Sequence, residues 1–103
     1  MNINDIVSII DEFAPLALQE DYDNVGLLVG DPMAKAKGVL LCIDVTEEII
    51  DEAISLDVNL IISHHPLIFN GLKKIVGSNA VQRSVIKAIK NDIAIYAAHT
   101  NID

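Results

Sequence analysis

The spacing of apolar residues predicts that the chain begins with an amphipathic helix. Four apolar side chains recur at the three- and four-residue intervals of one helix face: Ile6, Ile9, Ile10 and Phe13. Asn2 or Asn4 can cap the start of this helix, and Pro15 marks its end. A polar loop follows, then a short apolar segment between Gly26 and Gly30 and an Asp-Pro turn.

From residue 38 onward the pattern predicts strands that alternate with helices. The continuous apolar run 39–43 is typical of a parallel strand covered on both faces, and further strands are expected at 58–62 and 93–98. Thr46 should cap a helix, and a second helix should run from about Asn79. The expected inner faces of these two helices are Ile49, Ile50, Ala53 and Ile54 in the first, and Val81, Val85, Ala88 and Ile89 in the second. We therefore predict an α/β fold with a parallel-type βαβαβ core and helices on the sheet faces, preceded by the N-terminal helix and the short apolar segment.

Length and composition narrow the class of protein. At 103 residues the chain is expected to form a single domain, 1–103. Its 15 acidic and 7 basic residues give a net charge of −8, which argues against non-specific nucleic-acid binding. The single cysteine, Cys42, lies inside an apolar run and is expected to act as a small buried hydrophobe in a reducing, cytoplasmic setting. We expect neither a signal peptide nor a membrane span, because the N-terminus lacks a basic region and no apolar stretch reaches about 18 residues.

Potential metal ligands follow the ends of the predicted strands. His64 and His65 come after the run 58–62, and His99 and Asp103 come after the run 93–98. Ligands of open parallel sheets bind beyond the carboxyl ends of the strands, so these groups should meet at one edge. Imidazole is the commonest metal ligand in proteins. The pattern therefore predicts a metal site, with nitrogen and oxygen ligands suited to zinc, manganese, iron or nickel.

The residues alone leave several roles open. His64 and His65 reach one metal only if the backbone turns after Ser63; otherwise they suit two metal ions bridged by a carboxylate such as Asp103. The pair could also be loop residues that are hydrogen-bonded to backbone. His99 is as suited to orienting a ligand as to binding metal. Asp44 ends the first strand too, but a role in the turn before Thr46 is favoured.

Two further groups are minor candidates for the site. Lys73 and Lys74 are expected to be solvated loop charges, although they lie close enough in sequence to the histidines to meet an anionic substrate. Asp21, Asp23 and Asn24 are expected to form a turn.

Three segments, in order, resemble the signatures of the NIF-three-like family, and the similarity covers the whole chain. They are residues 23–30 (Asp-Asn-Val-Gly-Leu-Leu-Val-Gly), 62–69 (Ile-Ser-His-His-Pro-Leu-Ile-Phe) and 98–103 (Ala-His-Thr-Asn-Ile-Asp). The bacterial, YbgI-like members of this family often carry the name GTP cyclohydrolase I type 2. The resemblance implies an α/β protein with a dinuclear metal centre that assembles as a ring, commonly a hexamer.

Carried onto this sequence, the resemblance assigns specific residues. His64, His65 and Asp103 match family metal ligands, with Asp103 as the bridge between two divalent ions. The Asp23-Asn24 pair matches a motif near the same cavity, where Tyr22 stands in a position that tryptophan often fills. Family members continue past this point and complete the site with a His-x-x-x-Glu motif. The chain is therefore expected to be an N-terminal lobe with part of the metal shell and with exposed apolar surface that favours self-association.

The function that the resemblance implies is a metal-dependent hydrolase of the GTP cyclohydrolase I type 2 kind. Its partner would be a nucleotide-like small molecule, and His99 would be the catalytic residue that orients or shuttles a proton. The alternative is a metal-binding scaffold or regulatory interaction protein without catalysis. In either case we expect a homo-oligomer that binds neither nucleic acid nor membrane.

Overall fold

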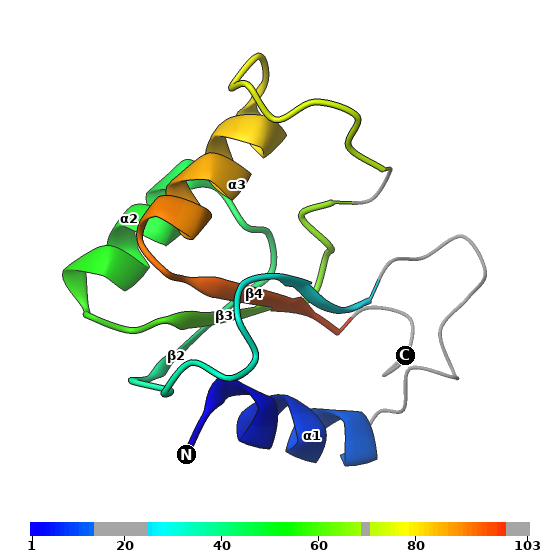
Figure 1. The fold of residues 1–103 in the computed structure, drawn as a ribbon, viewed down its shortest axis with the longest axis vertical. Coiled ribbons are helices and arrows are strands. Elements are labelled where there is room, and N and C mark those ends of the chain that lie inside the picture. The colour runs from blue at the N-terminus through cyan, green and yellow to red at the C-terminus, as the bar shows by residue number, and fades with distance from the viewer. Residues whose placement is uncertain (14–24, 69–70, 99–103) are drawn as a thin grey trace.

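Residues 1–13, 25–68 and 71–98 are described by the computed structural model, and in them one four-stranded sheet is covered by helices on both faces (Figure 1). The helices are α1 (Ile3–Phe13), α2 (Glu47–Ser55) and α3 (Ala80–Lys90). The strands are β1 (Gly26–Val29), β2 (Val39–Cys42), β3 (Leu60–Ser63) and β4 (Ala94–Ala97), in the spatial order β1-β4-β3-β2. Helices α2 and α3 lie on one face of the sheet and α1 lies on the other (Figure 1). The predicted α/β class is confirmed.

The sheet is mixed rather than wholly parallel. Strands β2, β3 and β4 are parallel, as the predicted βαβαβ order requires. The short apolar segment is an additional strand, β1, which pairs with β4 in the antiparallel direction. Gly26 at the start of the strand and Gly30 just after its end have φ angles of 104° and 110°, a backbone conformation that residues other than glycine rarely adopt. These glycines let the chain enter and leave the sheet edge.

Two apolar clusters form the core, one on each side of the sheet. On one side Ile50 of α2 and Val85 of α3 belong to a cluster with Ile61 and Ile95 of the sheet. On the other side α1 packs on β3 and β4, and Tyr96 is fully buried there. The phenol hydroxyl of Tyr96 donates a hydrogen bond of 2.5 Å to Asp11 Oδ1, which ties α1 to the middle of the sheet.

The buried face of α1 differs from the predicted one. Ile3 and Val7 are buried, Ile6 and Ile10 pack partly against the same cluster, and Ile9 is 59% exposed. At 3.6 residues per turn, Ile9 lies about 110° around the axis from the centre of the buried face. Both stripes have helical spacing, and contact with the sheet selects the one that begins at residue 3. The outermost residues of the other two predicted stripes, Ile54 and Ile89, are also exposed, at 41% and 56%.

The prediction that residues 39–43 form a strand covered on both faces is wrong, because β2 is an edge strand. Leu40 and Cys42 pack toward the α2 and α3 side. Leu41 and Ile43 are 72% and 65% exposed. Helix α1 packs on β3 and β4 and leaves the neighbouring face of β2 open.

Side chains cap the helices where the sequence predicts. The Thr46 hydroxyl accepts a hydrogen bond from the Ile49 N–H at 3.2 Å, and Asn79 Oδ1 accepts from the Gln82 N–H at 2.9 Å. Asn2 and Asp5 cap α1 reciprocally, since each side chain accepts from the backbone N–H of the other. Such caps stabilise a helix by about 1 kcal/mol each.

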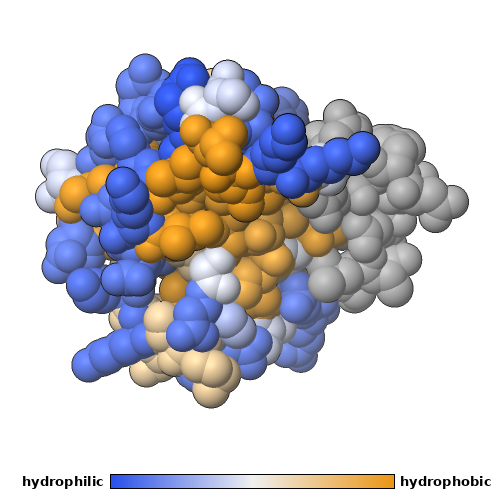
Figure 2. All heavy atoms as spheres, turned by 45° about the horizontal axis from the view of Figure 1, so that its top comes forward, coloured by the Kyte–Doolittle hydropathy of each residue, from blue (hydrophilic) through white to orange (hydrophobic). Residues whose placement is uncertain are grey.

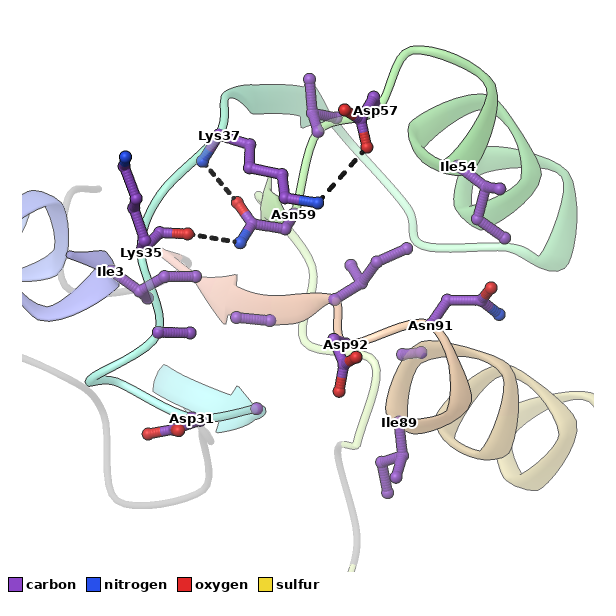
Figure 3. Close-up of a pocket in the computed structure, with 16 residues that line it drawn as sticks. Ile3, Asp31, Lys35, Lys37, Ile54, Asp57, Asn59, Ile89, Asn91 and Asp92 are labelled. Carbon is purple, nitrogen blue, oxygen red and sulfur yellow. Dashed lines mark hydrogen bonds and ion pairs between the residues drawn. The ribbon is translucent and has the colours of Figure 1, made fainter. Parts of the chain in front are cut away.

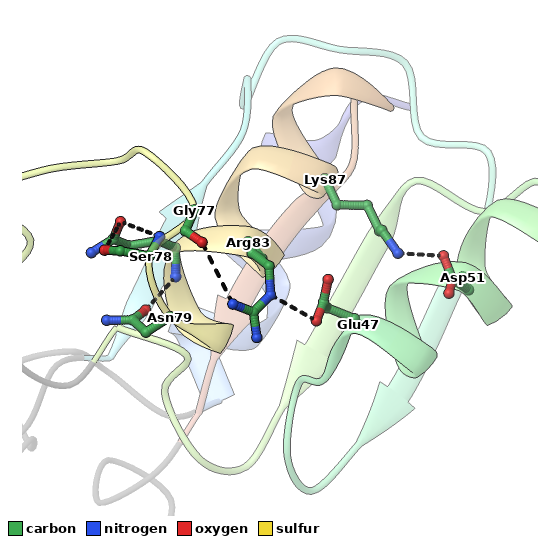
Figure 4. A network of polar contacts seen from close by, with 8 residues as sticks. Glu47, Asp51, Gly77, Ser78, Asn79, Arg83 and Lys87 are labelled. Atoms are coloured by element: carbon green, nitrogen blue, oxygen red, sulfur yellow. Dashed lines mark hydrogen bonds and ion pairs between the residues drawn. The ribbon is translucent and has the colours of Figure 1, made fainter.

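Ion pairs connect α2 to α3 along their exposed sides (Figure 4). Arg83 Nε lies 3.4 Å from Glu47 Oε2, and Lys87 Nζ lies 2.9 Å from Asp51 Oδ1. The hydrogen bond to Asp51 raises the pKa of Lys87. Exposed pairs of this kind contribute little to stability because water and salt screen them, so apolar packing is the main interaction between the two helices.

Apolar residues also reach the surface in several elements. Figure 2 shows a broad apolar area framed by hydrophilic residues. Exposed large apolar side chains include Ile75 and Val76 in the segment before α3. Apolar patches of this kind commonly mark a surface that another protein segment covers. Among the described residues no helix is long and apolar enough to cross a bilayer.

Gln82 should be the residue that holds the segment before α3 in place. It is buried, and its Oε1 accepts hydrogen bonds from the N–H groups of Val76 and Ser78 and from the Ser78 hydroxyl, at 2.9–3.1 Å. We expect Gln82→Leu to lower the free energy of unfolding by about 1–3 kcal/mol, because these donors lose their acceptor. Urea denaturation measures the change, and amide hydrogen exchange at Val76 and Ser78 should become faster. Gln82→Glu keeps the oxygen and should stay close to the wild type; equal losses in both variants would contradict this role.

Candidate metal centre

The adjacent histidines lie at the carboxyl end of β3, as the sequence predicts. Two backbone hydrogen bonds link them to the end of β2: the His64 N–H donates to the Cys42 carbonyl at 3.1 Å, and the His65 N–H donates to the Ile43 carbonyl at 2.9 Å. These two bonds fix the backbone of the pair against the end of β2. The backbone of both histidines is therefore hydrogen-bonded to the neighbouring chain at this end of the sheet.

A turn after Ser63 brings the two imidazoles together. The Ser63 side chain is buried, and its hydroxyl donates a hydrogen bond of 2.8 Å to the His65 carbonyl. In an extended strand the two rings would point to opposite faces. Here their centroids are 5.1 Å apart, with 41° between the ring planes. The two rings are therefore close enough to take part in the same centre, whether that centre holds one metal ion or two.

Asp44 fixes the orientation of the His65 ring. Its Oδ1 lies 2.6 Å from His65 Nδ1, with both side chains partly exposed. When Nδ1 carries the proton and donates it to the carboxylate, Nε2 carries the lone pair that can bind a metal. A histidine that binds metal almost always donates its other ring N–H in this way. The donor chemistry of His65 therefore fits a metal ligand.

The contact corrects the interpretation of Asp44 as a turn residue alone. Asp44 directly follows Ile43, and the Ile43 carbonyl pairs with His65 across the sheet edge. A signal for this contact is present in the sequence, since both residues follow the ends of strands. The register of β2 against β3, which the sequence does not show, is what places Asp44 beside His65.

Several predicted site residues lie outside the described residues. These are Asp21, Tyr22, Asp23, Asn24, His99 and Asp103. Ala98, which precedes His99, donates its N–H to the Ser63 carbonyl at 2.9 Å, next to the histidine turn. Within residues 1–13, 25–68 and 71–98 there is no group of three His, Cys, Asp or Glu side chains that could hold a metal ion. The ligand set of His64, His65 and Asp103 stays a prediction.

Cys42 does not add a reactive thiolate to this edge. Burial raises the pKa of its thiol, and the negative charges of Asp44 and Glu52 raise it further. A thiol with a raised pKa stays protonated near neutral pH, which disfavours both nucleophilic attack and metal binding. Cys42 packs against the core as a small apolar side chain, but it is partly buried rather than fully buried as predicted.

A cavity of about 710 Å³ lies at the opposite, amino edge of the sheet (Figure 3). Asn59 organises one wall: its side-chain amide donates to the Lys35 carbonyl, and its Oδ1 accepts from the Lys37 N–H, both at 2.8 Å. Lys37 Nζ also lies 3.5 Å from Asp57 Oδ1. Neither histidine lines this cavity. Since open α/β sheets bind ligands at the carboxyl ends of their strands, the histidine edge remains the stronger candidate.

Comparison with known proteins is consistent across sequence and structure. The chain is 44% and 47% identical, over all 103 residues, to proteins of Clostridium acetobutylicum and Clostridium perfringens that are each named GTP cyclohydrolase 1 type 2 homolog. It spans 38% and 39% of their lengths. The crystal structure of Staphylococcus aureus protein SA1388 matches all of this chain with a TM-score of 0.95 at 43% identity, and 33% of its own chain is covered. The model of the Duf34/NIF3 (NGG1p interacting factor 3) family matches residues 1–103, and the chain belongs to that family.

Proposed function

We propose that His64 and His65 bind divalent metal in a hydrolase that acts on a nucleotide-like substrate. The observation that carries this proposal is the His65–Asp44 hydrogen bond of 2.6 Å beside a second imidazole 5.1 Å away. The names of the relatives, GTP cyclohydrolase 1 type 2 homolog, support a nucleotide as the substrate class. Because the chain spans 38% of the first of these relatives, the activity proposed is that of the whole protein.

The proposed centre is dinuclear, and His64, His65 and Asp103 would hold its two divalent ions. When bound, such ions lower the pKa of a coordinated water toward neutrality, and so supply a nucleophile. Zinc, manganese, iron and nickel all suit imidazole and carboxylate ligands.

Other residues of the chain would orient the histidines, transfer a proton and attract the substrate. Asp44 holds the His65 ring in one orientation, and Ser63 holds the turn that places both rings on one side. His99 is proposed to transfer a proton to or from the substrate. Lys73 and Lys74 are exposed and positively charged, and would attract an anionic phosphate chain.

The second candidate function is a metal-binding scaffold without turnover, in the cytoplasm and as a homo-oligomer. It is supported by the histidine pair and by the Asp44 carboxylate that holds the His65 ring, a set of side chains suited to holding a metal ion. A scaffold needs metal and a binding surface, but no general base.

A turnover assay separates the two candidates. The protein is loaded with Zn²⁺, Mn²⁺, Fe²⁺ or Ni²⁺, incubated with GTP and other nucleotides, and the products are separated by chromatography. The hydrolase predicts product that disappears in His65→Ala and falls strongly in His99→Ala. The same assay on the full-length Clostridium acetobutylicum relative shows whether more of the chain is needed. Stoichiometric metal with no product from either protein would contradict the hydrolase and favour the scaffold.

A further inference from the structure

The cavity at the amino edge of the sheet lies where α2 and α3 end (Figure 3). Residues from the ends of both helices line it, and the opposite wall comes from Ile3 of α1, Gly30 after β1 and part of the segment before β2. Its volume of about 710 Å³ is within the range of small-molecule sites, roughly 300–1,000 Å³. The cavity is therefore large enough for a small organic ligand.

The turns that end α2 and α3 at this cavity have the same structure. Each contains an aspartate with a positive φ angle, 56° at Asp57 and 54° at Asp92. In each turn the next residue donates its N–H to the carbonyl five positions before it, at 3.0 Å for Val58 and 2.9 Å for Ile93. Glycine, or less often asparagine, usually occupies the left-handed position of such a turn. Both aspartates therefore stand where another residue type would suit the backbone better.

The side chains that the two turns present to the cavity are also repeated. The sequences are Ala-Ile-x-x-Asp-Val at 53–58 and Ala-Ile-x-x-Asp-Ile at 88–93. Ile54 and Ile89 line the cavity together with the two aspartates, and they are 41% and 56% exposed. Further apolar residues line the same space: Ile3, Ala34, Val58, Ala88, Ile93 and Ala94. The cavity thus combines an apolar surface with a carboxylate at each helix end.

The charges around Asp92 favour a cation. The C-terminus of a helix carries roughly half a negative charge, the Asp92 carboxylate adds to it, and Asp31 also lines the cavity. Among the described residues no ion pair reaches the Asp92 carboxylate. Lys35 lines the cavity, but its side chain points away from Asp92 (Figure 3), and Lys87 and Lys90 of α3 do not line it. A positively charged group of a ligand would complement this part of the cavity.

Lys37 shows what kind of cation the repeated turn can hold. At the α2 turn its ammonium lies 3.5 Å from Asp57 Oδ1, and its aliphatic chain reaches across to that carboxylate (Figure 3). The backbone of Lys37 is held by the buried Asn59, whose Oδ1 accepts from the Lys37 N–H at 2.8 Å. The side chain of lysine is a primary amine on a chain of methylene groups. The α3 turn has the same carboxylate and isoleucine, and no lysine of the described chain fills it.

From these observations we propose that the cavity binds a primary amine with an aliphatic body, with the ammonium at Asp92 and the aliphatic part against Ile89 and Ile54. The amine would occupy the α3 turn as Lys37 occupies the α2 turn. The carboxylate selects the charge of the ligand. The isoleucines select its aliphatic part, because a small hydrated ion gains nothing from apolar walls. This site lies at the opposite edge of the sheet from the histidines, so it does not depend on the proposed metal centre.

Titration with amines of different length tests the class of ligand. With a chelator present, so that metal plays no part, hexylamine is added to isotope-labelled protein and the amide signals are followed by NMR. The signals of Asp92 and Ile93 should shift and saturate. Hexanoate should bind roughly tenfold or more weakly because its charge is opposite, and so should ethylamine because it lacks four of the methylene groups. Equal affinity for hexylamine and ethylamine would mean that any cation suffices and would overturn the proposal, as would the absence of a saturable shift with hexylamine.

Asp92→Asn tests the carboxylate without disturbing the turn. Asparagine suits the left-handed position, and a helix C-terminus is more favourable without a negative charge, so urea denaturation should show no loss of stability. The affinity for hexylamine should fall roughly tenfold or more, because the ammonium loses its charged acceptor. Glu12→Gln is the matched control: Glu12 is exposed on α1 and does not line the cavity, and its variant should bind hexylamine as the wild type does. Equal affinities of Asp92→Asn and Glu12→Gln would overturn the proposed site.

Discussion

Asp44→Ala is expected to weaken divalent-metal binding 10- to 100-fold without unfolding the protein. Asp44 Oδ1 lies 2.6 Å from His65 Nδ1, and a hydrogen bond donated by Nδ1 would leave the Nε2 lone pair to bind a metal ion. Losing such a partner from a metal-bound histidine typically reduces affinity by about this factor, or roughly 1.4–2.7 kcal/mol. Competition with a chelator of known affinity, run separately with Zn²⁺, Mn²⁺, Fe²⁺ and Ni²⁺, measures the change.

Two variants separate orientation from simple loss of charge. Asp44→Asn keeps an oxygen that can accept from Nδ1 and should bind metal with intermediate affinity. Asp51→Ala removes a carboxylate from the exposed side of α2, where Asp51 pairs with Lys87, and should bind metal as the wild type does. If Asp44→Ala bound metal as tightly as Asp51→Ala, Asp44 would have no role in orienting a ligand.

Gly30→Ala should be among the most destabilising single substitutions, at about 2–5 kcal/mol. An added Cβ would lie 2.6 Å from Ala94 Cα and 2.7 Å from Ala94 Cβ, so β1 or β4 must shift. The φ angle of 110° is also unfavourable for alanine. Urea denaturation, followed by circular dichroism, measures the loss in unfolding free energy.

Two other glycines provide controls that separate the backbone strain at Gly30 from the steric clash with Ala94. Gly77 has a φ of 80° but its Cβ would make only ordinary contacts, at 3.7 Å from Arg83 Cγ, so Gly77→Ala isolates the backbone strain. Gly71 has nothing within 4 Å of an added Cβ, and Gly71→Ala should be nearly neutral. If Gly30→Ala were as stable as Gly77→Ala, the clash with Ala94 would cost no free energy of unfolding, and this prediction would be wrong.

Local patterns predict much of the fold because helices and caps depend on neighbours in sequence. Thr46 and Asn79 cap the helices that their positions indicate, and the strands at the centre of the sheet coincide with apolar runs. Which strands pair with each other does not follow from local sequence patterns. The antiparallel pairing of β1 with β4 joins residues about 70 positions apart, and nothing local specifies it.

The same reasoning explains the errors in burial. A continuous apolar run is expected for a strand covered on both faces, and β2 has such a run at the open edge of the sheet. For Leu41 the sequence correctly indicates an apolar strand position. Its exposure arises because α1 covers β3 and β4 but does not extend across the sheet to β2. In α1, contact with Tyr96 and Leu60 decides between two stripes that are equally helical.

For the candidate site, the sequence predicts the location but not the supporting contacts. Strand ends place His64 and His65 at the carboxyl edge, since parallel strands end together. The Ser63 hydrogen bond that turns the chain, and the pairing of Asp44 with His65, depend on the register between β2 and β3. The residues 99–103, which carry His99 and Asp103, lie outside the described chain, so their roles stay predictions.

The most direct test of the central claim is the metal content of the wild-type chain and of the His64→Ala/His65→Ala double variant. Each protein is equilibrated with a single divalent metal, separated from unbound ions and measured by elemental analysis beside its protein concentration. Binding through the two imidazoles predicts stoichiometric metal in the wild type and almost none in a double variant that is still folded by circular dichroism. Equal metal in the two proteins would contradict the claim that these histidines are the ligands.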